Sequence, residues 1–405
     1  MRVVLVLALL ALAGCGGSST TSQRTPLTVV VNAPFSRLPY LGRTIENGVR
    51  LAERDVNANG IRLGDRTYEL RVRTMDTALS PARAVANVRR AVAGDAIAIV
   101  DEGTGIDASW RLAAASGIPI GIVFQGGSGL VDAESRPNVF RIAPTDHGLA
   151  FRLAEYLIPK RLKIGLLHDD SDYGAAGARA LATAFSRNRS SVAIDETLPA
   201  DAFDLAPQVL RARRAGATAL LVWGRPSTIA SAVTAARAAG WNVPFFTPPT
   251  GSDPFVRQQL ADHPTWVDGL TFAGGRLTAE VGSGPFLTFE QKYASEFGVD
   301  RVGVKTSTGA SVVVPPETAT YAYDFVNLLA AAILKAGSIA PRKVTAALNE
   351  VSIEGANGDQ RGFNRNNHEG VIDDDIYFAR FHDMTYAPVK DDPLSATLPT
   401  LPQTR

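Results

Sequence analysis

The chain has 405 residues, of which 45% are hydrophobic and 20% are charged, so it contains ample apolar material for packed cores. Its 41 basic and 40 acidic residues give a formal net charge of +1, and this lack of a basic excess argues against a nucleic-acid-binding protein. The single cysteine excludes a disulfide within the chain.

The first residues have the pattern of a secretion signal. Arg2 precedes the apolar run 3–13, which is too short to span a membrane, for which about 20 residues are needed. The run ends in Leu-Ala-Gly-Cys at 12–15, which resembles the lipobox of bacterial lipoproteins. That resemblance implies that a diacylglyceryl group is attached to Cys15, and two acyl chains anchor a protein stably. The alternative is a signal peptide with an incidental cysteine, which would leave a free thiol outside the cell.

Cleavage before Cys15 would leave 40 basic and 40 acidic residues in the mature chain, a net charge of zero. The segment 15–26 is rich in Gly, Ser and Thr, which predicts a flexible tether. No later apolar run approaches 18 residues, so we expect no further membrane span. By length, the remainder forms two or three domains.

From Leu27 onward, short apolar strands alternate with amphipathic helices. Ile45, Val49 and Ala52 recur at helical spacing, and Ser80 followed by Pro81 is typical of a helix start. The first series comprises predicted strands at 27–32, 68–76, 96–100 and 118–124, with helices at 42–59, 80–93 and 107–116.

A second series of the same kind follows the segment 138–146. It comprises predicted strands at 163–169, 191–198, 217–223 and 243–248, with helices at 147–159, 174–187, 205–215 and 227–240. Two such series predict an α/β fold of two lobes, each with a parallel sheet covered by helices on both faces. The tail is irregular, with helices at 285–297 and 318–336, turns at 357–370 and a strand at 375–383.

The sequence offers little support for catalysis or cofactor binding. Gly103–Ala108 fits the dinucleotide pattern, but it follows the third strand of its series, and Gln125 stands where an acidic residue is expected. The five histidines are scattered without metal-ligand spacing. Asp373–Asp375 could ligate calcium, although such a run is more often a solvated turn. We therefore expect a non-enzyme without a cofactor or a metal.

Ligands of open α/β sheets bind beyond the carboxyl ends of the strands. The segments that follow the predicted strands are rich in Gly, Ser, Thr and Asp, with isolated aromatic residues. Glycine N–H groups and helix N-termini can hold a carboxylate without a charged side chain. Tyr173 and Trp223 could cover an apolar body and donate a hydrogen bond. The alternative is that these are ordinary loop residues.

Several stretches carry a resemblance to a known family. They are 45–61, 75–93, 116–120, 138–146, 163–181, 228–240 and 318–338, in this order and spacing. Together they resemble the branched-chain amino acid type substrate-binding proteins of ATP-driven importers, which have the type I periplasmic binding fold. The match runs from about Leu27 to His382.

The resemblance implies two Rossmann-like lobes joined by a hinge of three chain crossings, expected near 142–146, 271–276 and 355–363. Lobe 1 would comprise 27–143 and 275–358, and lobe 2 would comprise 144–274 and 359–390, with a C-terminal tail at 391–405. It further implies that a small ligand binds between the lobes of a monomer outside the cytoplasm, and that the closed complex docks onto an ABC permease. A sensor of the same fold and a secreted α/β enzyme remain alternatives.

The family's ligand-holding positions carry over to Glu102, Gly103, Thr104, Phe124, Gln125, Gly126, Ser128, Tyr173, Trp223 and Arg225. Tyr40 and Thr250 complete the set of twelve candidate ligand contacts.

One departure from the family concerns the ligand's ammonium. Amino-acid binders pair it with a glutamate in the loop that corresponds to 247–253, where this chain has no acid before Asp253. Because a buried ammonium without a partner is costly, ordinary α-amino acids should bind poorly unless Glu102 or Asp170 substitutes. Arg225 could accept a second carboxylate of the ligand, or it could be a structural residue on the rim.

Overall fold

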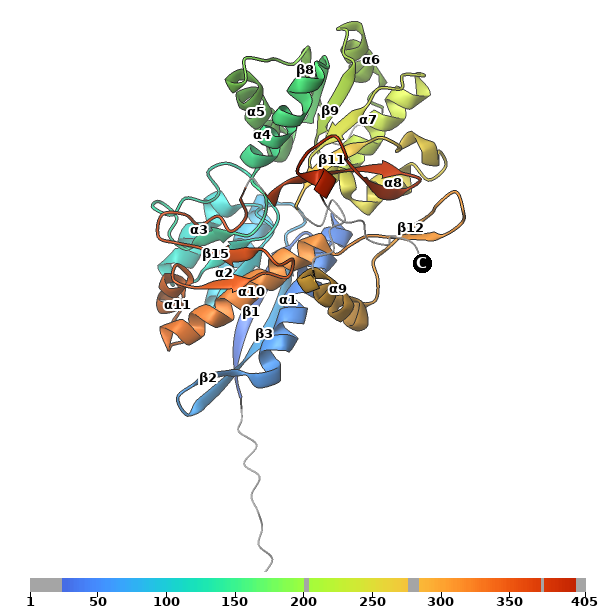
Figure 1. Cartoon of the computed structure of the whole chain (residues 1–405). Helices are drawn as coiled ribbons and strands as arrows, with labels where there is room; N and C mark the ends of the chain where they lie inside the picture. The colour runs from blue at the N-terminus through green and yellow to red at the C-terminus, as the bar shows by residue number, and fades with distance from the viewer. Residues whose placement is uncertain (1–23, 200–203, 276–283, 373–374, 398–405) are drawn as a thin grey trace, which may run out of the picture.

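The computed structural model describes residues 24–199, 204–275, 284–372 and 375–397. Two lobes, each built around its own β-sheet, lie end to end (Figure 1). The predicted signal segment, Cys15 and all but the last residues of the tether lie outside the described residues, as does most of the acidic run at 373–375.

The first lobe contains a six-stranded sheet in the order β2-β3-β1-β4-β5-β6, parallel except for β2. Alternate residues of β1 are buried on opposite faces, because successive side chains of a strand point in opposite directions. Val29 and Val31 pack with helices α1, α10 and α11, whereas Val30 packs with α2 and α3. The strands are β1 (Thr25–Ala33), β2 (Ile61–Leu63), β3 (Arg66–Asp76), β4 (Ala98–Asp101), β5 (Ile120–Ile122) and β6 (Val139–Arg141). The helices are α1 (Pro39–Asn59), α2 (Pro81–Ala93), α3 (Ile106–Ala115), α9 (Gly284–Phe297), α10 (Glu317–Ala336) and α11 (Pro341–Leu348).

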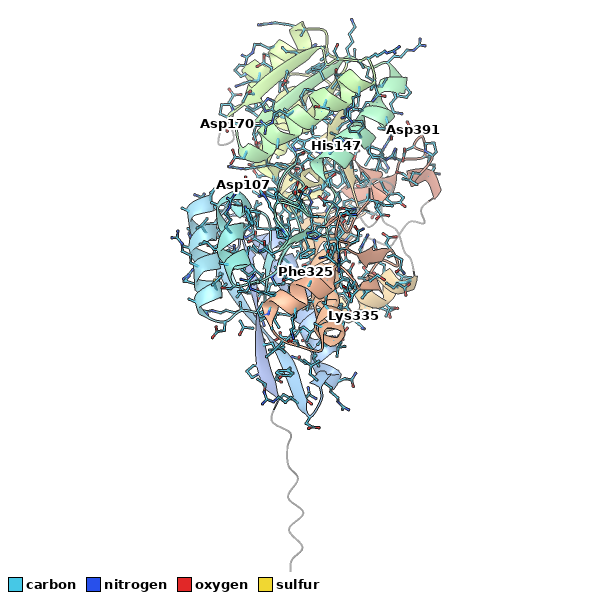
Figure 2. All side chains as sticks on the ribbon, turned by 90° about the vertical axis from the view of Figure 1, so that its left-hand side faces the viewer. Asp107, His147, Asp170, Phe325, Lys335 and Asp391 are labelled. Atoms are coloured by element: carbon cyan, nitrogen blue, oxygen red, sulfur yellow. The ribbon has the colours of Figure 1, made fainter. Side chains whose placement is uncertain are left out.

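Helices α1 and α10 approach each other closely on one face of this sheet. Gly48 allows the approach, since a Cβ there would lie 2.2 Å from the Ala319 carbonyl oxygen. Phe325 of α10 is fully buried against the sheet (Figure 2). No single helix in the described ranges is long and apolar enough to cross a membrane, although α10 and α11, bent by 110°, satisfy the criteria as a pair.

The second lobe contains a seven-stranded sheet in the order β17-β16-β11-β10-β9-β7-β8. The sheet is parallel from β8 to β11, and β16 and β17 add antiparallel strands at one edge. Its strands are β7 (Ile164–Asp169), β8 (Ile194–Leu198), β9 (Ala219–Trp223), β10 (Phe245–Thr247), β11 (Thr271–Gly274), β16 (Tyr377–His382) and β17 (Thr385–Pro388). Its helices are α4 (Asp146–Leu157), α5 (Asp172–Arg187), α6 (Ala206–Arg214), α7 (Pro226–Ala238) and α8 (Pro254–Gln259).

The last passage between the lobes lies later in the chain than expected. Strand β14 (Ser352–Glu354) pairs with β15 (Gln360–Gly362), and Phe363 and Val371 pack in the core of the first lobe. Ile376 is the next residue of the second lobe's core. The segment 359–371 therefore packs with lobe 1 rather than with lobe 2, because its apolar side chains reach the α10 side of the first sheet.

A β-hairpin also departs from the expected division. Strands β12 (Arg301–Lys305) and β13 (Ser311–Val313) follow α9 of the first lobe, yet Val302, Val304 and Val312 pack in the core of the second lobe. The hairpin turn is fixed there because Ser307 N–H donates to Asp383 Oδ1 at 2.6 Å. The residues of the expected C-terminal tail that are described also pack with lobe 2, where the Phe378 N–H donates to Ser395 Oγ at 2.8 Å.

Candidate ligand-binding site

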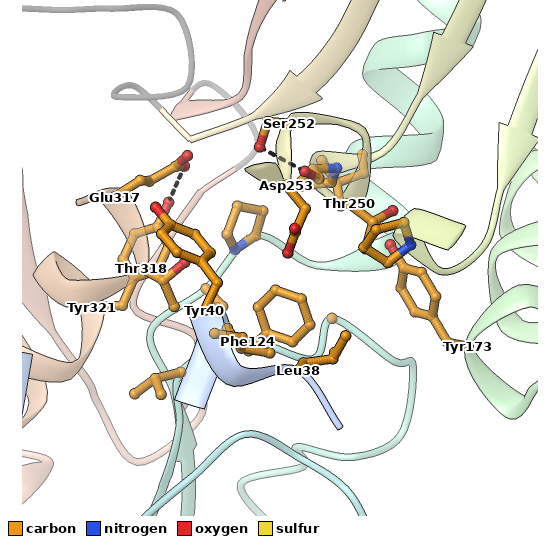
Figure 3. Close-up of a pocket in the computed structure, with 18 of the residues that line it drawn as sticks. Leu38, Tyr40, Phe124, Tyr173, Thr250, Ser252, Asp253, Glu317, Thr318 and Tyr321 are labelled. Carbon is orange, nitrogen blue, oxygen red and sulfur yellow. Dashed lines mark hydrogen bonds between the residues drawn. The ribbon is translucent and has the colours of Figure 1, made fainter. Parts of the chain in front are cut away.

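Two connected hollows lie between the lobes. The inner cavity has a volume of about 80 Å³ and the outer chamber a volume of about 490 Å³. Both lobes line both hollows, and the two share Leu38, Phe124, Asp146, Tyr173, Pro226 and Thr250. Figure 3 shows the inner cavity, with Tyr40, Phe124 and Tyr173 around it.

The first lobe contributes the loop that follows β4. Gly103 has a positive φ of +118°, and a Cβ at this position would lie 2.5 Å from the Gln125 side chain, so the loop requires glycine. Glu102 is fully buried and accepts hydrogen bonds from Thr77 Oγ1 at 3.1 Å and from Gln125 Nε2 at 3.2 Å. The Gln125 amide also donates to Thr104 Oγ1 at 3.0 Å. Glu102 therefore orients the predicted contact Gln125, which in turn bonds the predicted contact Thr104.

A second carboxylate lies directly behind Glu102. Asp101 is fully buried and accepts hydrogen bonds from Asn32 Nδ2 at 2.8 Å and from the Gly103 N–H at 2.7 Å. Burial and the neighbouring Glu102 charge raise the pKa of Asp101 to about 8, and burial also raises the pKa of Glu102. The pair therefore holds a proton under conditions in which an exposed carboxyl group would be ionised.

Arg141 fixes the loop that follows β5, which contains the predicted contacts Phe124 to Ser128. Its Nη1 donates to the carbonyl oxygens of Gln125 at 3.1 Å and Gly127 at 3.0 Å. Its other two nitrogens form a bidentate ion pair with Glu369, at 2.7 and 2.5 Å. The buried guanidinium thus ties this loop to the segment that precedes the last crossing.

In the second lobe, Asp169 organises two helix N-termini beside the cleft. Its buried carboxylate accepts hydrogen bonds from the Arg225 N–H at 2.7 Å and from Thr228 Oγ1 at 3.3 Å, both at the start of α7. The same carboxylate accepts from the hydroxyl of Ser171, the N-cap of α5. Thr250 is fixed because its hydroxyl donates to the Gly224 carbonyl at 2.8 Å.

Trp223 does not line either hollow, contrary to the prediction. It is fully buried and belongs to the core cluster that also contains Ala219 and Leu221, on the face of β9 covered by α5. The two-residue period of the strand directs it to this face. Its ring lies 5.9 Å from the ring of Tyr173, so it supports Tyr173 from behind.

The other predicted residues lie along the hollows. Tyr40 and Gly126 line the inner cavity, whereas Glu102, Gly103, Thr104, Gln125, Ser128 and Arg225 line the outer chamber. Asp170, offered as a possible ammonium partner, is exposed and lines neither hollow; Figure 2 shows it at the edge of the second lobe, across from Asp107 of the first lobe.

Asp146, the first residue of α4, was not among the predicted ligand contacts. Its side chain is 2% exposed and lines both hollows, and neither carboxylate oxygen forms a hydrogen bond with the described residues. Burial raises the pKa of Asp146 to about 7, although the nearby Arg141 charge lowers it. The cleft therefore contains a buried acidic side chain outside the loops at the strand ends, because Asp146 lies at a crossing between the lobes.

These raised pKa values predict that stability falls as the pH rises. Asp146 binds a proton in the folded state up to about pH 7 but loses it near pH 4 when unfolded, so the folded state holds the extra proton between these values. The unfolding free energy of the parent should fall between pH 5 and pH 8. In the Asp146→Asn variant, which has no carboxyl group at this position, this fall should be smaller by about 2–3 kcal/mol. Urea unfolding at both pH values measures this difference. Arg141 and Tyr173 face Asp146 and remain unchanged in the variant. Parallel pH curves for the two proteins would contradict the prediction.

Metal binding finds no support in the described ranges. They contain no group of three or more His, Cys, Asp or Glu side chains arranged to hold a metal ion.

Comparison with known proteins places this cleft in a structural context. A periplasmic binding protein of type 1 from Bordetella pertussis Tohama I has a TM-score of 0.79 and 22% identity, and the match covers 90% of this chain and all of that one. A branched-chain amino acid transporter substrate binding protein from Streptococcus pneumoniae, in complex with isoleucine, has a TM-score of 0.73 and 19% identity over 89% of this chain and 98% of that one. A solute binding protein from Rhodopseudomonas palustris, in complex with benzoate, has a TM-score of 0.72 and 17% identity over 89% and 95% of the two chains.

These similarities confirm the predicted two-lobed α/β fold. No curated protein matches the sequence. The family model for periplasmic binding proteins, however, matches residues 31–386, which is most of the chain. The resemblance noted in the sequence is thereby confirmed, and the chain belongs to the periplasmic binding protein family.

Proposed function

We propose that this chain is an extracytoplasmic, lipid-anchored solute-binding protein that captures a small polar organic ligand between its lobes and delivers it to an ABC importer. The observation that carries the proposal is a cleft lined from both sides, by Thr104 and Phe124 of the first lobe and by Tyr173 and Thr250 of the second. A ligand that contacts both lobes favours their closed arrangement, which is the hinge movement that such a protein needs.

The relatives support the ligand class only broadly. One is in complex with isoleucine and another with benzoate, so this fold accommodates both an amino acid and an aromatic acid. In this chain, Glu102, Gly103, Thr104, Gln125, Ser128, Tyr173, Arg225 and Thr250 are the proposed contacts of the outer chamber, and Tyr40, Phe124 and Gly126 are those of the inner cavity.

A thermal-shift screen of small acids, amides, amines and amino acids tests the binding function. A ligand selective for the native state raises the melting temperature, and one present at 100 times its Kd stabilises by about 2.7 kcal/mol. Small-angle scattering with the strongest hit should show a decrease in the radius of gyration as the lobes close. A panel in which no solute shifts the melting temperature would count against solute binding.

Anchoring and delivery need separate experiments. The Cys15→Ser variant should move from the membrane fraction to the soluble fraction, because it cannot accept the diacylglyceryl group. Co-purification of the ligand-loaded protein with an ABC permease, but not with a signalling kinase, would favour import over sensing.

A further inference from the structure

The charges around the cleft are unevenly distributed. Three carboxylates line the inner cavity, those of Asp146, Asp253 and Glu317, whereas no Lys or Arg among the described residues lines it. The outer chamber has charges of both signs, because the guanidinium groups of Arg179 and Arg225 line it together with the carboxyl groups of Glu102, Asp107, Asp146 and Asp172. A ligand that extends through both hollows therefore meets carboxyl groups without a lining cation at the inner end, and it meets guanidinium groups only in the outer chamber.

Asp146 differs from the other two carboxyl groups because neither of its oxygens accepts a hydrogen bond from the described residues. Its backbone N–H donates to the Gly126 carbonyl at 2.8 Å, so the residue is held at the wall of the cavity. Both carboxylate oxygens are buried and form no hydrogen bond with the described residues. The nearest cation, Arg141, does not pair with Asp146 because its guanidinium is already occupied by Glu369 and two loop carbonyls. Because a buried carboxylate without a hydrogen-bond donor is costly, we expect the ligand to provide a donor to Asp146.

The other two carboxylates come from opposite lobes. Asp253 precedes α8 and accepts the Phe255 N–H at 2.8 Å, and Figure 3 shows its carboxylate pointing into the inner cavity. Glu317 begins α10 and accepts from the Gly275 N–H at 2.8 Å and from the Tyr321 hydroxyl at 3.0 Å. Closure of the lobes thus brings negative charge to the cavity from both sides.

The remaining wall of the inner cavity is largely aromatic and aliphatic. The rings of Tyr40, Phe124, Tyr173 and Tyr321 line it. Aromatic faces attract cations, and this attraction is strongest when the cation is shielded from water. Acidic oxygens together with aromatic rings form a suitable environment for an ammonium group on an alkyl chain, and an unfavourable one for a carboxylate.

We propose that the inner cavity holds the positively charged ammonium end of an elongated ligand, with Asp146 accepting its N–H hydrogen bonds, while the polar remainder of the ligand lies in the outer chamber. This inference rests on the proposed solute-binding function. It names the ligand class as alkyl amines and basic amino acids, in which the ammonium is separated from any carboxylate by several methylene groups. Leucine-like amino acids fit less well, because their own carboxylate would lie beside the acidic wall.

Calorimetric titration with cadaverine, lysine, norleucine and benzoate tests the proposal. Lysine and norleucine share the same carbon skeleton, so their comparison isolates the terminal ammonium. Lysine and cadaverine should each bind at least tenfold more tightly than norleucine or benzoate. The Asp146→Asn variant, which keeps the shape of the side chain, should lose this preference.

Asp65→Asn is the matched control, because it removes the same charge from an exposed turn between β2 and β3, far from the cleft. It should retain the tenfold preference. Thermal melting at pH 5 should show that both variants fold. Equal binding of lysine and norleucine, or a preference that survives in Asp146→Asn, would overturn the inference.

The outcomes also separate the inference from the function on which it rests. Binding of norleucine or benzoate without binding of either amine would overturn the ammonium assignment and leave solute binding standing. A lack of heat and of any thermal shift with all four probes would overturn the ammonium assignment and count against solute binding as well.

Discussion

The Arg141→Ala variant should lose about 3 kcal/mol of unfolding free energy, the lower end of the range for removing one partner of a buried ion pair, because Glu369 is 25% exposed. The Arg141 side chain is only 3% exposed, and its removal leaves Glu369 and the carbonyl oxygens of Gln125 and Gly127 without their donor. Urea denaturation with an unchanged m-value measures the loss.

An exposed pair provides the control for this variant. Arg71 bonds Glu69 on the surface and its side chain is 63% exposed, so Arg71→Ala should cost less than about 1 kcal/mol. If Arg141→Ala lost as little unfolding free energy as Arg71→Ala, the hydrogen bonds from Arg141 to the loop after β5 would not be needed for stability.

The second large effect should come from Asp169→Ala in the other lobe. The substitution removes the acceptor shared by the Arg225 N–H, Thr228 and Ser171, and hydrogen bonds to a charged group contribute about 1.5–3 kcal/mol each. We expect a loss of at least about 3 kcal/mol and faster amide exchange at the start of α7.

Asp195→Ala removes a half-exposed carboxylate from the neighbouring strand β8 and serves as the control. Its amide exchange at the start of α7 should match that of the parent. If Asp169→Ala also left this exchange unchanged, Asp169 would not be the residue that fixes the second lobe's side of the cleft.

Much of the fold could be predicted from local patterns. The apolar run at 27–32 became the central strand β1, and Ser80 caps α2 as predicted, its side chain accepting from the Arg83 N–H. Both features depend on residues that are close together in the sequence. They could therefore be predicted from a single sequence. The hairpin at 301–313 was missed even though its buried valines alternate with exposed residues, because it interrupts the helical pattern of the tail.

The site was less predictable, because it depends on contacts between distant segments. Strand ends pointed to the loops that contain Thr104, Phe124 and Tyr173, and these residues line the hollows between the lobes, since the carboxyl ends of parallel strands meet at one edge. The same reasoning misplaced Trp223, whose direction is set by the strand's alternation. It also gave no sign of Asp146, which is buried at a crossing, beside hollows that residues of both lobes line.

The hairpin at 301–313 has a mechanical consequence for ligand release. Its stems at 298–300 and 314–316 connect it to α9 and α10 of one lobe, while Gln258 Nε2 donates to the Val302 carbonyl at 2.6 Å in the other. These two segments connect the lobes in addition to the three crossings, so the lobes cannot move far apart unless the segments bend. The unliganded protein should therefore sample a narrow range of opening angles, and less motional freedom would be lost when a solute is captured.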